Sequence, residues 1–414
     1  MTSVQSHRLP SSGNKWLVLA VIGLILGACS PKIRPDNTPH KTAEVKKQPP
    51  PVVAPKPVAP KVATIALLLP FNLDQLELGT NANQANLSKA DLALDYYQGF
   101  KLALDSLTAK GYSYKLQVFD SRDAAAQARS LATDARVRSS DLIVGPVFPE
   151  SVTAFASSFT ANKLVVSPLS PAAPELFKSN KLVTVIPPLA YHALAAAQYI
   201  NGHIKPKRVF ILRSGYSDEN KYITPFHKAI DSLSQKRMPV TSLVVTHGNL
   251  DGLTPQLSTT DENVFIVPAT DEVFLTVTLR SLQKLAQTYP VTVFGHPNWT
   301  GFDFLKPELL QDIKTHITTA DNIDHKSPVT MAFVKNYKRL YHIAPSEYAI
   351  KGFDEGYYFG GLLSTGADAL SHLDKASYNG LYNQFNFVKT TNYGWVNTHV
   401  TILQYQNFEL KKVE

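Results

Sequence analysis

After residue 61, hydrophobic and polar positions follow strand-like and helix-like patterns in turn. Val62 to Leu69 form a nearly continuous apolar run that ends at Pro70. This pattern predicts a strand buried on both faces of a parallel sheet. Beyond a polar loop, a stripe of apolar residues at helical spacing predicts a helix with a capping box at Ser88 and Asp91. The stripe comprises Leu92, Tyr96, Phe100, Ala103 and Leu107.

The same alternation continues to the C-terminus. We expect strands at 114–119, 142–144, 164–166 and 182–186, with helices at 124–137 and 152–161. After Pro187 and Pro188 a second series follows: strands at 208–212, 240–245, 264–267 and 291–294, and helices at 222–233 and 272–287. The remainder predicts helices at 331–340 and 348–363 and a last strand at 400–405. Strands that alternate with helices indicate βαβ units and doubly wound sheets.

Two similar series predict an α/β protein with two doubly wound, Rossmann-like lobes joined by a hinge. Roughly 350 residues also exceed the ~250–300 at which single hydrophobic cores stop growing. We expect lobe 1 to comprise about residues 62–188 and 317–370. Lobe 2 should comprise about residues 189–316 and 371–414.

The N-terminus has the pattern of a bacterial lipoprotein signal. Residues 1–15 contain basic but no acidic side chains, and an apolar run of 11 residues follows at 16–26. Such a run has the length of a signal-peptide core and is too short to span a bilayer. Leu26-Gly27-Ala28-Cys29 then resembles a lipobox, which implies a signal peptide at 1–28 and a diacylglyceryl anchor on Cys29. Stable anchoring requires several acyl chains on that residue. Because acidic residues are absent until Asp36, resemblance to known sorting rules suggests the outer membrane, facing the periplasm.

Residues 29–61 are predicted to be a disordered linker rich in proline and lysine. In a polyproline II conformation it would reach on the order of 90 Å. It could simply clear the lipid headgroups, or it could let the domain act far from its membrane, near peptidoglycan. Of the formal net charge of +8, only +1 lies beyond Lys61. The folded part therefore lacks the excess of basic residues typical of nucleic-acid-binding domains, and we exclude that class.

Five segments in order resemble the type I periplasmic binding proteins, the class that binds leucine, isoleucine and valine. They are Ile65–Pro70, Tyr97–Asp105, Leu142–Pro146, Val165–Pro168 and Gly352–Tyr358. The lipobox, linker and opening strand also resemble lipoprotein activators of penicillin-binding proteins, which have the same fold. The first resemblance implies a small polar ligand, amino-acid-like or peptide-like, and an ABC permease as partner. The second implies a peptidoglycan synthase as partner.

The resemblance also implies an interlobe cleft lined by loops at the carboxyl ends of the strands, where open α/β sheets bind ligands. The candidate ligand-binding residues in these loops are Phe71, Asn72, Asp120, Ser121, Phe148, Ser151, Ser167, Ser170, Tyr216, Thr270, His296 and Trp299. For any single polar residue among them, ordinary helix capping is the alternative interpretation.

One feature departs from the amino-acid-binding members, which hold the ligand carboxylate with hydroxyls after the third and fourth strands. Here the matching positions lie near Pro149, Leu169 and Pro171, so that Ser151 and Ser170 would have to substitute.

The sequence lacks the P-loop, zinc-protease and nucleophile-elbow motifs. Asp354 and Glu355 are adjacent, and on a helix they would point about 100° apart rather than at one target. We therefore expect no catalysis, no cofactor and no metal. A solute-binding lipoprotein is the first hypothesis, and a non-enzymatic envelope lipoprotein that regulates peptidoglycan synthesis through protein contacts is the second. A hydrolase of envelope material remains as a third.

Overall fold

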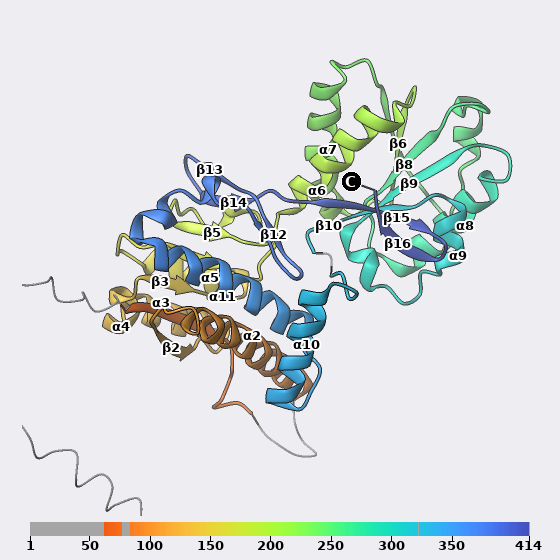
Figure 1. Ribbon diagram of the computed structural model, residues 1–414. Coiled ribbons are helices and arrows are strands. Elements are labelled where there is room, and N and C mark those ends of the chain that lie inside the picture. The colour runs from red at the N-terminus through yellow and green to blue at the C-terminus, as the bar shows by residue number, and fades with distance from the viewer. Residues whose placement is uncertain (1–61, 77–82, 322, 414) are drawn as a thin grey trace, which may run out of the picture. The chain divides into compact units, whose positions relative to one another are not determined.

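The computed structural model describes residues 62–76, 83–321 and 323–413, and of Ala367 only the backbone (Figure 1). The predicted signal peptide, Cys29 and the predicted linker lie outside the described residues, so these predictions remain untested. Within the described part, no helix combines the length and apolar character needed to cross a membrane.

The first sheet has seven strands in the order β13-β14-β5-β4-β3-β1-β2. All neighbouring strands are parallel except β13 and β14. The strands are β1 Ala63–Leu69, β2 Tyr114–Asp120, β3 Leu142–Val144, β4 Val165–Ser167, β5 Leu182–Thr184, β13 Phe387–Thr390 and β14 Gly394–Asn397.

The second sheet has the same number of strands, in the order β16-β15-β10-β9-β8-β6-β7. Strand β15 is antiparallel to both of its neighbours. The strands are β6 Val209–Arg213, β7 Val240–Val244, β8 Asn263–Val267, β9 Val291–Gly295, β10 His316–Thr319, β15 Thr401–Gln406 and β16 Glu409–Lys412. A separate two-stranded sheet joins β11 Tyr378–Asn379 to β12 Gln384–Phe385.

Both faces of each large sheet are covered, which confirms the predicted doubly wound α/β class. In β1, Ile65 and Leu67 pack into one core cluster while Ala66 and Leu68 pack into another. The period of two therefore buries alternate residues on opposite faces, as the continuous apolar run predicted. We refer to the first sheet with its helices as lobe 1 and to the second as lobe 2.

In lobe 1, α2 (Gln84–Thr108) and α11 (Glu347–Thr365) cover one face, and α3 (Ala125–Thr133) and α5 (Pro149–Ser158) cover the other. Helices α4 (Ala135–Ser139) and α10 (Pro328–Tyr341) complete it. In lobe 2, α6 (Leu189–Tyr199) and α7 (Asn220–Leu233) lie opposite α8 (Glu272–Leu285) and α9 (Pro307–Asp312).

Helices α2 and α11 lie side by side with their backbones in contact (Figure 1). A Cβ atom added to Gly99 would lie 1.8 Å from the carbonyl oxygen of Ala349, and one added to Gly352 would lie 2.2 Å from that of Tyr96. Glycine is required at these positions because any side chain would push the two helices apart.

The structure corrects several details of the sequence prediction. Helix α2 begins at Gln84 and is capped by the side chain of Asn83, so the capping box at Ser88 and Asp91 is wrong. Asp134 caps α4 and divides the predicted helix 124–137. Helix α6 was not predicted at all. The stretch 371–397 was assigned to lobe 2, whereas β13 and β14 lie in the first sheet. Lobe 1 therefore extends to residue 397, since β14 inserts between β13 and β5.

Candidate functional site

The loops at the carboxyl ends of β1 and β2 are joined by the carboxylate of Asp120. It accepts hydrogen bonds from the backbone N–H groups of Asn72 (3.1 Å), Leu73 (3.0 Å) and Arg122 (2.9 Å). Asn72 is buried and has a left-handed φ of 52°, which this carboxylate supports. Asp120 and Asn72 therefore build the loop. The half-buried ring of Phe71 packs edge-on against Tyr97.

The two hydroxyls predicted to hold a ligand carboxylate have local partners. Ser151 lies in the first turn of α5 and donates to Asp123 over 3.3 Å, while Ser170 accepts from the backbone N–H of Ala172 over 3.3 Å. Both serines are only 1% exposed. In this conformation neither hydroxyl is directed at solvent, so a ligand could reach them only after local rearrangement.

Ser121 directly follows β2, and Ser167 is the last residue of β4. Both are also buried. Among the described residues, neither hydroxyl has a hydrogen-bond partner. Phe148 precedes α5 and is half-buried, and the ammonium of Lys89 lies 5.4 Å from its ring centre. In lobe 1, the aromatic candidates Phe71 and Phe148 thus remain more accessible than the serines.

In lobe 2 the four candidates have different environments. Tyr216 and Thr270 are exposed, so their role in ligand binding stays a prediction. His296 caps a short 3-10 turn through Nδ1, which accepts from the N–H of Asn298, and burial lowers the pKa of its imidazole to about 4. Trp299 is 1% exposed, and its indole N–H donates to a backbone carbonyl in the core, so it packs inside the lobe.

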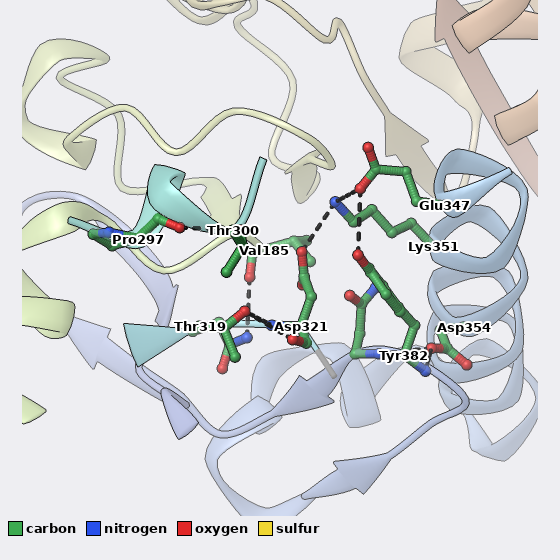
Figure 2. A network of polar contacts seen from close by, with 11 residues as sticks. Val185, Pro297, Thr300, Thr319, Asp321, Glu347, Lys351, Asp354 and Tyr382 are labelled. Carbon is green, nitrogen blue, oxygen red and sulfur yellow. Dashed lines mark hydrogen bonds and ion pairs between the residues drawn. The ribbon is translucent and has the colours of Figure 1, made fainter. Parts of the chain in front are cut away.

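A network of polar contacts lies where the chain passes between the lobes (Figure 2). Lys351 of α11 is buried and pairs with Asp321 (3.0 Å) and Glu347 (3.1 Å). Burial disfavours its charge, but the attraction of Asp321 and Glu347 raises the pKa of Lys351 above its usual range. The chain crosses between the lobes three times, after β5, after β10 and after β14. Asp321 lies two residues after the end of β10, so this pair fixes the second crossing to a helix of lobe 1.

Asp354, one turn further along α11, holds the segment before β12. Its carboxylate accepts from the backbone N–H groups of Leu381 (2.8 Å), Tyr382 (2.9 Å) and Asn383 (2.8 Å). Burial raises the pKa of Asp354 to about 6, against the stabilising effect of these donors. Its neighbour Glu355 instead accepts from the hydroxyl of Tyr96. The two carboxylates therefore face different partners, as the helical geometry predicted.

The first and third crossings are joined to each other through Asn397. Its amide nitrogen donates to the carbonyls of Val185 (3.0 Å) and Gln384 (2.9 Å), and its oxygen accepts from the N–H of His399 (3.1 Å).

On the lobe 2 side, His192 Nδ1 lies 3.0 Å from the hydroxyl of Thr318. The first crossing is thus anchored at Val185 and His192 and the second at Thr318 and Asp321, whereas the third runs from Asn397 to the start of β15. The stretches 186–191, 319–320 and 398–400 lie between these positions. We call these three stretches and their anchoring side chains the hinge.

Sequence reasoning did not find the hinge residues. The available signal was the presence of Lys351, Asp354 and Glu355 within the otherwise apolar helix 348–363, where charged residues are rarely buried without partners. Only the two acids were considered there, and as a catalytic pair. Among the described residues, no cluster of three or more histidine, cysteine, aspartate or glutamate side chains could hold a metal ion.

Comparison with solved structures identifies the fold as that of the type I periplasmic binding proteins. A protein described as a branched-chain amino acid ABC transporter from Rhodospirillum rubrum has 16% identity and a TM-score of 0.62, over 85% of this chain and 100% of that one.

A substrate-binding protein from Desulfitobacterium hafniense in complex with Leu has 16% identity and a TM-score of 0.55 over the same shares. A branched-chain amino acid ABC transporter periplasmic ligand-binding protein from Burkholderia xenovorans LB400 has 11% identity and a TM-score of 0.57, over 85% of this chain and 94% of that one. At such identities the likeness shows the fold alone. No protein-family model and no curated protein matches the chain.

Proposed function

We propose that this chain is a solute-binding lipoprotein that captures a small ligand between loops at the carboxyl ends of the strands of its two lobes. The observation that carries the proposal is the hinge. Its three short stretches adjoin buried polar anchors, among them Lys351 with Asp321 and Asn397 with Val185. Anchors that fix the segment ends confine backbone rotation to a few residues, which is how hinge closure around ligands works.

The chemistry of the accessible candidates suggests the kind of ligand. Phe71 and Phe148 are half-buried in lobe 1, and Tyr216 and Thr270 are exposed in lobe 2. A planar or apolar ligand body with few polar groups fits this set better than a free amino acid. The reason is that Ser151 and the other expected carboxylate-binding hydroxyl already have partners. In a transport role, the ligand would be passed to an ABC permease.

Membrane attachment belongs to the same proposal. The lipobox at Leu26–Cys29 supports cleavage before Cys29 and acylation of its sulfur, and the residues after it support the outer membrane. The test is metabolic labelling with a fatty-acid analogue. Label on the wild-type protein and none on Cys29→Ser is the expected result, whereas equal labelling of both would contradict the anchor.

A second candidate function is regulation of a peptidoglycan synthase through protein contacts, without catalysis. The observation that favours it is the burial and local pairing of Ser151 and Ser170, which removes the feature by which related folds hold a carboxylate. The fold would then serve as a surface rather than as a receptor. A long linker suits a protein that must reach a distant partner.

Thermal unfolding of residues 62–414 distinguishes the two functions. The panel comprises amino acids, aromatic acids, short peptides, nucleosides and muropeptides. A ligand at 100 times its dissociation constant adds about 2.7 kcal/mol to the unfolding free energy, which shifts the midpoint by a few degrees. The shift should be lost in Phe71→Ala and kept in Leu94→Ala, an exposed apolar residue of α2 outside these loops. A well-folded protein with no shift for any compound would refute capture of these solutes.

A further inference from the structure

A groove crosses lobe 1 at the edge opposite the loops discussed above. A cavity of about 510 Å³ lies against the starts of β1 and β2, and it shares Asn162 and Lys163 with a second cavity of about 310 Å³. The second shares Asn180 and Lys181 with a third of about 390 Å³ at the end of β13. The hollows therefore adjoin. Because they extend from β2 to β13 across a seven-stranded sheet, the groove is about 29 Å long at ~4.8 Å per strand spacing.

Lysines outnumber carboxylates in this groove, and the excess positive charge lies in its second and third cavities. Lys163, Lys178, Lys181 and Lys389 line it, and Asp141 is the only carboxylate among the lining residues of the three cavities. Asp141 lies 3.9 Å from Lys163. Lys181 donates to carbonyls at the end of α5. Within the described part of the chain, Lys178 and Lys389 have no carboxylate within ion-pair distance, so the groove has a surplus of cationic groups.

The remaining lining residues include ten serines, threonines and asparagines, several apolar residues, and the aromatic residues Tyr112, Tyr114, Phe159 and Trp395. Tyr112 is 40% exposed, whereas Trp395 is 3% exposed and covered on one face by Lys389. No arginine lines the three cavities. Single-stranded nucleic acid would require a series of exposed aromatic platforms, which this groove lacks. Ammonium groups separated by neutral hydrogen-bonding groups instead match a polymer whose acidic groups alternate with hydroxyls.

We propose that this groove binds an extended, carboxylate-bearing glycan. The lysines would pair with the carboxylates, and the amides and hydroxyls between them would bond to the sugar hydroxyls. The groove lies at the amino ends of the parallel strands, whereas the proposed solute site lies at their carboxyl ends. The two sites are therefore independent, and either could be present without the other.

The test uses the whole mature chain with Cys29→Ser and measures binding of a fluorescent oligogalacturonate by polarisation. The groove variant is Lys163→Gln/Lys178→Gln/Lys389→Gln, which leaves Lys181 and its structural hydrogen bonds intact. The matched control removes three positive charges from exposed positions on α10, which lies outside the groove: Lys335→Gln/Lys338→Gln/Arg339→Gln. Wild-type binding should weaken with salt. The groove variant should bind about tenfold more weakly, and the control within about twofold of wild type.

Three further probes separate a glycan site from simple charge attraction. A neutral dextran oligomer should not bind, and polyglutamate of equal charge should bind about tenfold more weakly than oligogalacturonate. Soluble peptidoglycan strands carry their carboxylates on peptides. Comparing their binding with that of oligogalacturonate therefore distinguishes peptidoglycan from uronate-containing polysaccharides as the ligand. Equal weakening in both triple variants, equal binding of polyglutamate, or no binding of either glycan would overturn the proposal. If the groove variant unfolds at a lower temperature, Lys178→Gln and Lys389→Gln alone should each weaken binding about threefold.

Discussion

Replacement of Lys351 by methionine tests whether the ion pair at the second crossing holds the hinge. The substitution preserves most of the side-chain volume in the space between α11 and residue 321 but removes the ammonium. Asp321, whose side chain is 19% exposed, then loses its partner at 3.0 Å. Glu347 loses one at 3.1 Å, but its side chain is 47% exposed and water can replace the lysine.

The expected destabilisation follows from these exposures. Removing one partner of a buried ion pair costs about 3–5 kcal/mol, because the other charge stays buried and unpaired. Asp321 is not completely buried, so we expect the low end, about 3 kcal/mol. The exposed pair with Glu347 adds less than about 1 kcal/mol. In Lys351→Met/Asp321→Asn both charges are absent, and we expect recovery of about 2 kcal/mol relative to Lys351→Met.

Urea denaturation monitored by tryptophan fluorescence measures these values in residues 62–414. Trp395 lies in lobe 1 and Trp299 in lobe 2, so a tryptophan-to-phenylalanine change in either lobe makes the other lobe's signal readable alone. In Lys351→Met, the unfolding transition reported by Trp395 should move to lower urea concentration before the one reported by Trp299 does. A loss below 1 kcal/mol, or a double variant whose destabilisation equals the sum of the single ones, would refute the assigned role of the pair.

Three other outcomes are expected. Burial raises the pKa of Glu355 well above its usual range. The folded protein therefore holds a proton that the unfolded chain releases near pH ~4.3, so this group alone makes stability fall by up to ~1.4 kcal/mol per pH unit above that value. Glu355→Gln lacks this contribution but keeps those of Asp354 and the buried histidines, so the difference in stability between the two proteins should change with pH, and parallel urea midpoints of both from pH 5 to 8 would contradict it. Gly99→Ala should destabilise by about 3 kcal/mol or prevent folding because its Cβ would overlap α11, whereas Gly361→Ala, with open space at its Cβ, should be neutral or stabilising in thermal unfolding. Trp299→Phe should cost about 1–2 kcal/mol through the lost indole hydrogen bond and leave ligand affinity unchanged, while a tenfold loss of affinity would return this residue to the binding site.

The architecture could be predicted because parallel strands covered on both faces are apolar along their whole length. The runs at 62–69 and 264–267 have this character, and both form interior strands with a neighbour on each side. Short strands carry no such signal. Only one of the four residues of β13 is buried, and β14, although buried throughout, contains a glycine and an asparagine. The boundary of lobe 1 was consequently placed too early.

The candidate site was less predictable, because sequence position identifies a loop but not the partner of a side chain. Ser151 and Ser170 occur near the positions where carboxylate-binding hydroxyls were expected. In the structure both are buried and form hydrogen bonds with nearby residues. The hinge was missed for the opposite reason. Lys351 and Asp321 are thirty residues apart, and nothing in either neighbourhood indicates that a helix and a crossing segment meet there.

The order of strands in the first sheet determines when during synthesis the fold can be completed. Strand β14, at Gly394–Asn397, inserts between β5 and β13, and β15, which pairs with β10 of the other sheet, follows it directly. Neither sheet can be completed until residues 394–412 have emerged from the ribosome. The proposed export would gain from this late closure, because the N-terminal part could not form a finished lobe before the proposed signal is recognised. Truncation of the last thirty residues should accordingly leave two incomplete sheets rather than one intact lobe and one damaged one.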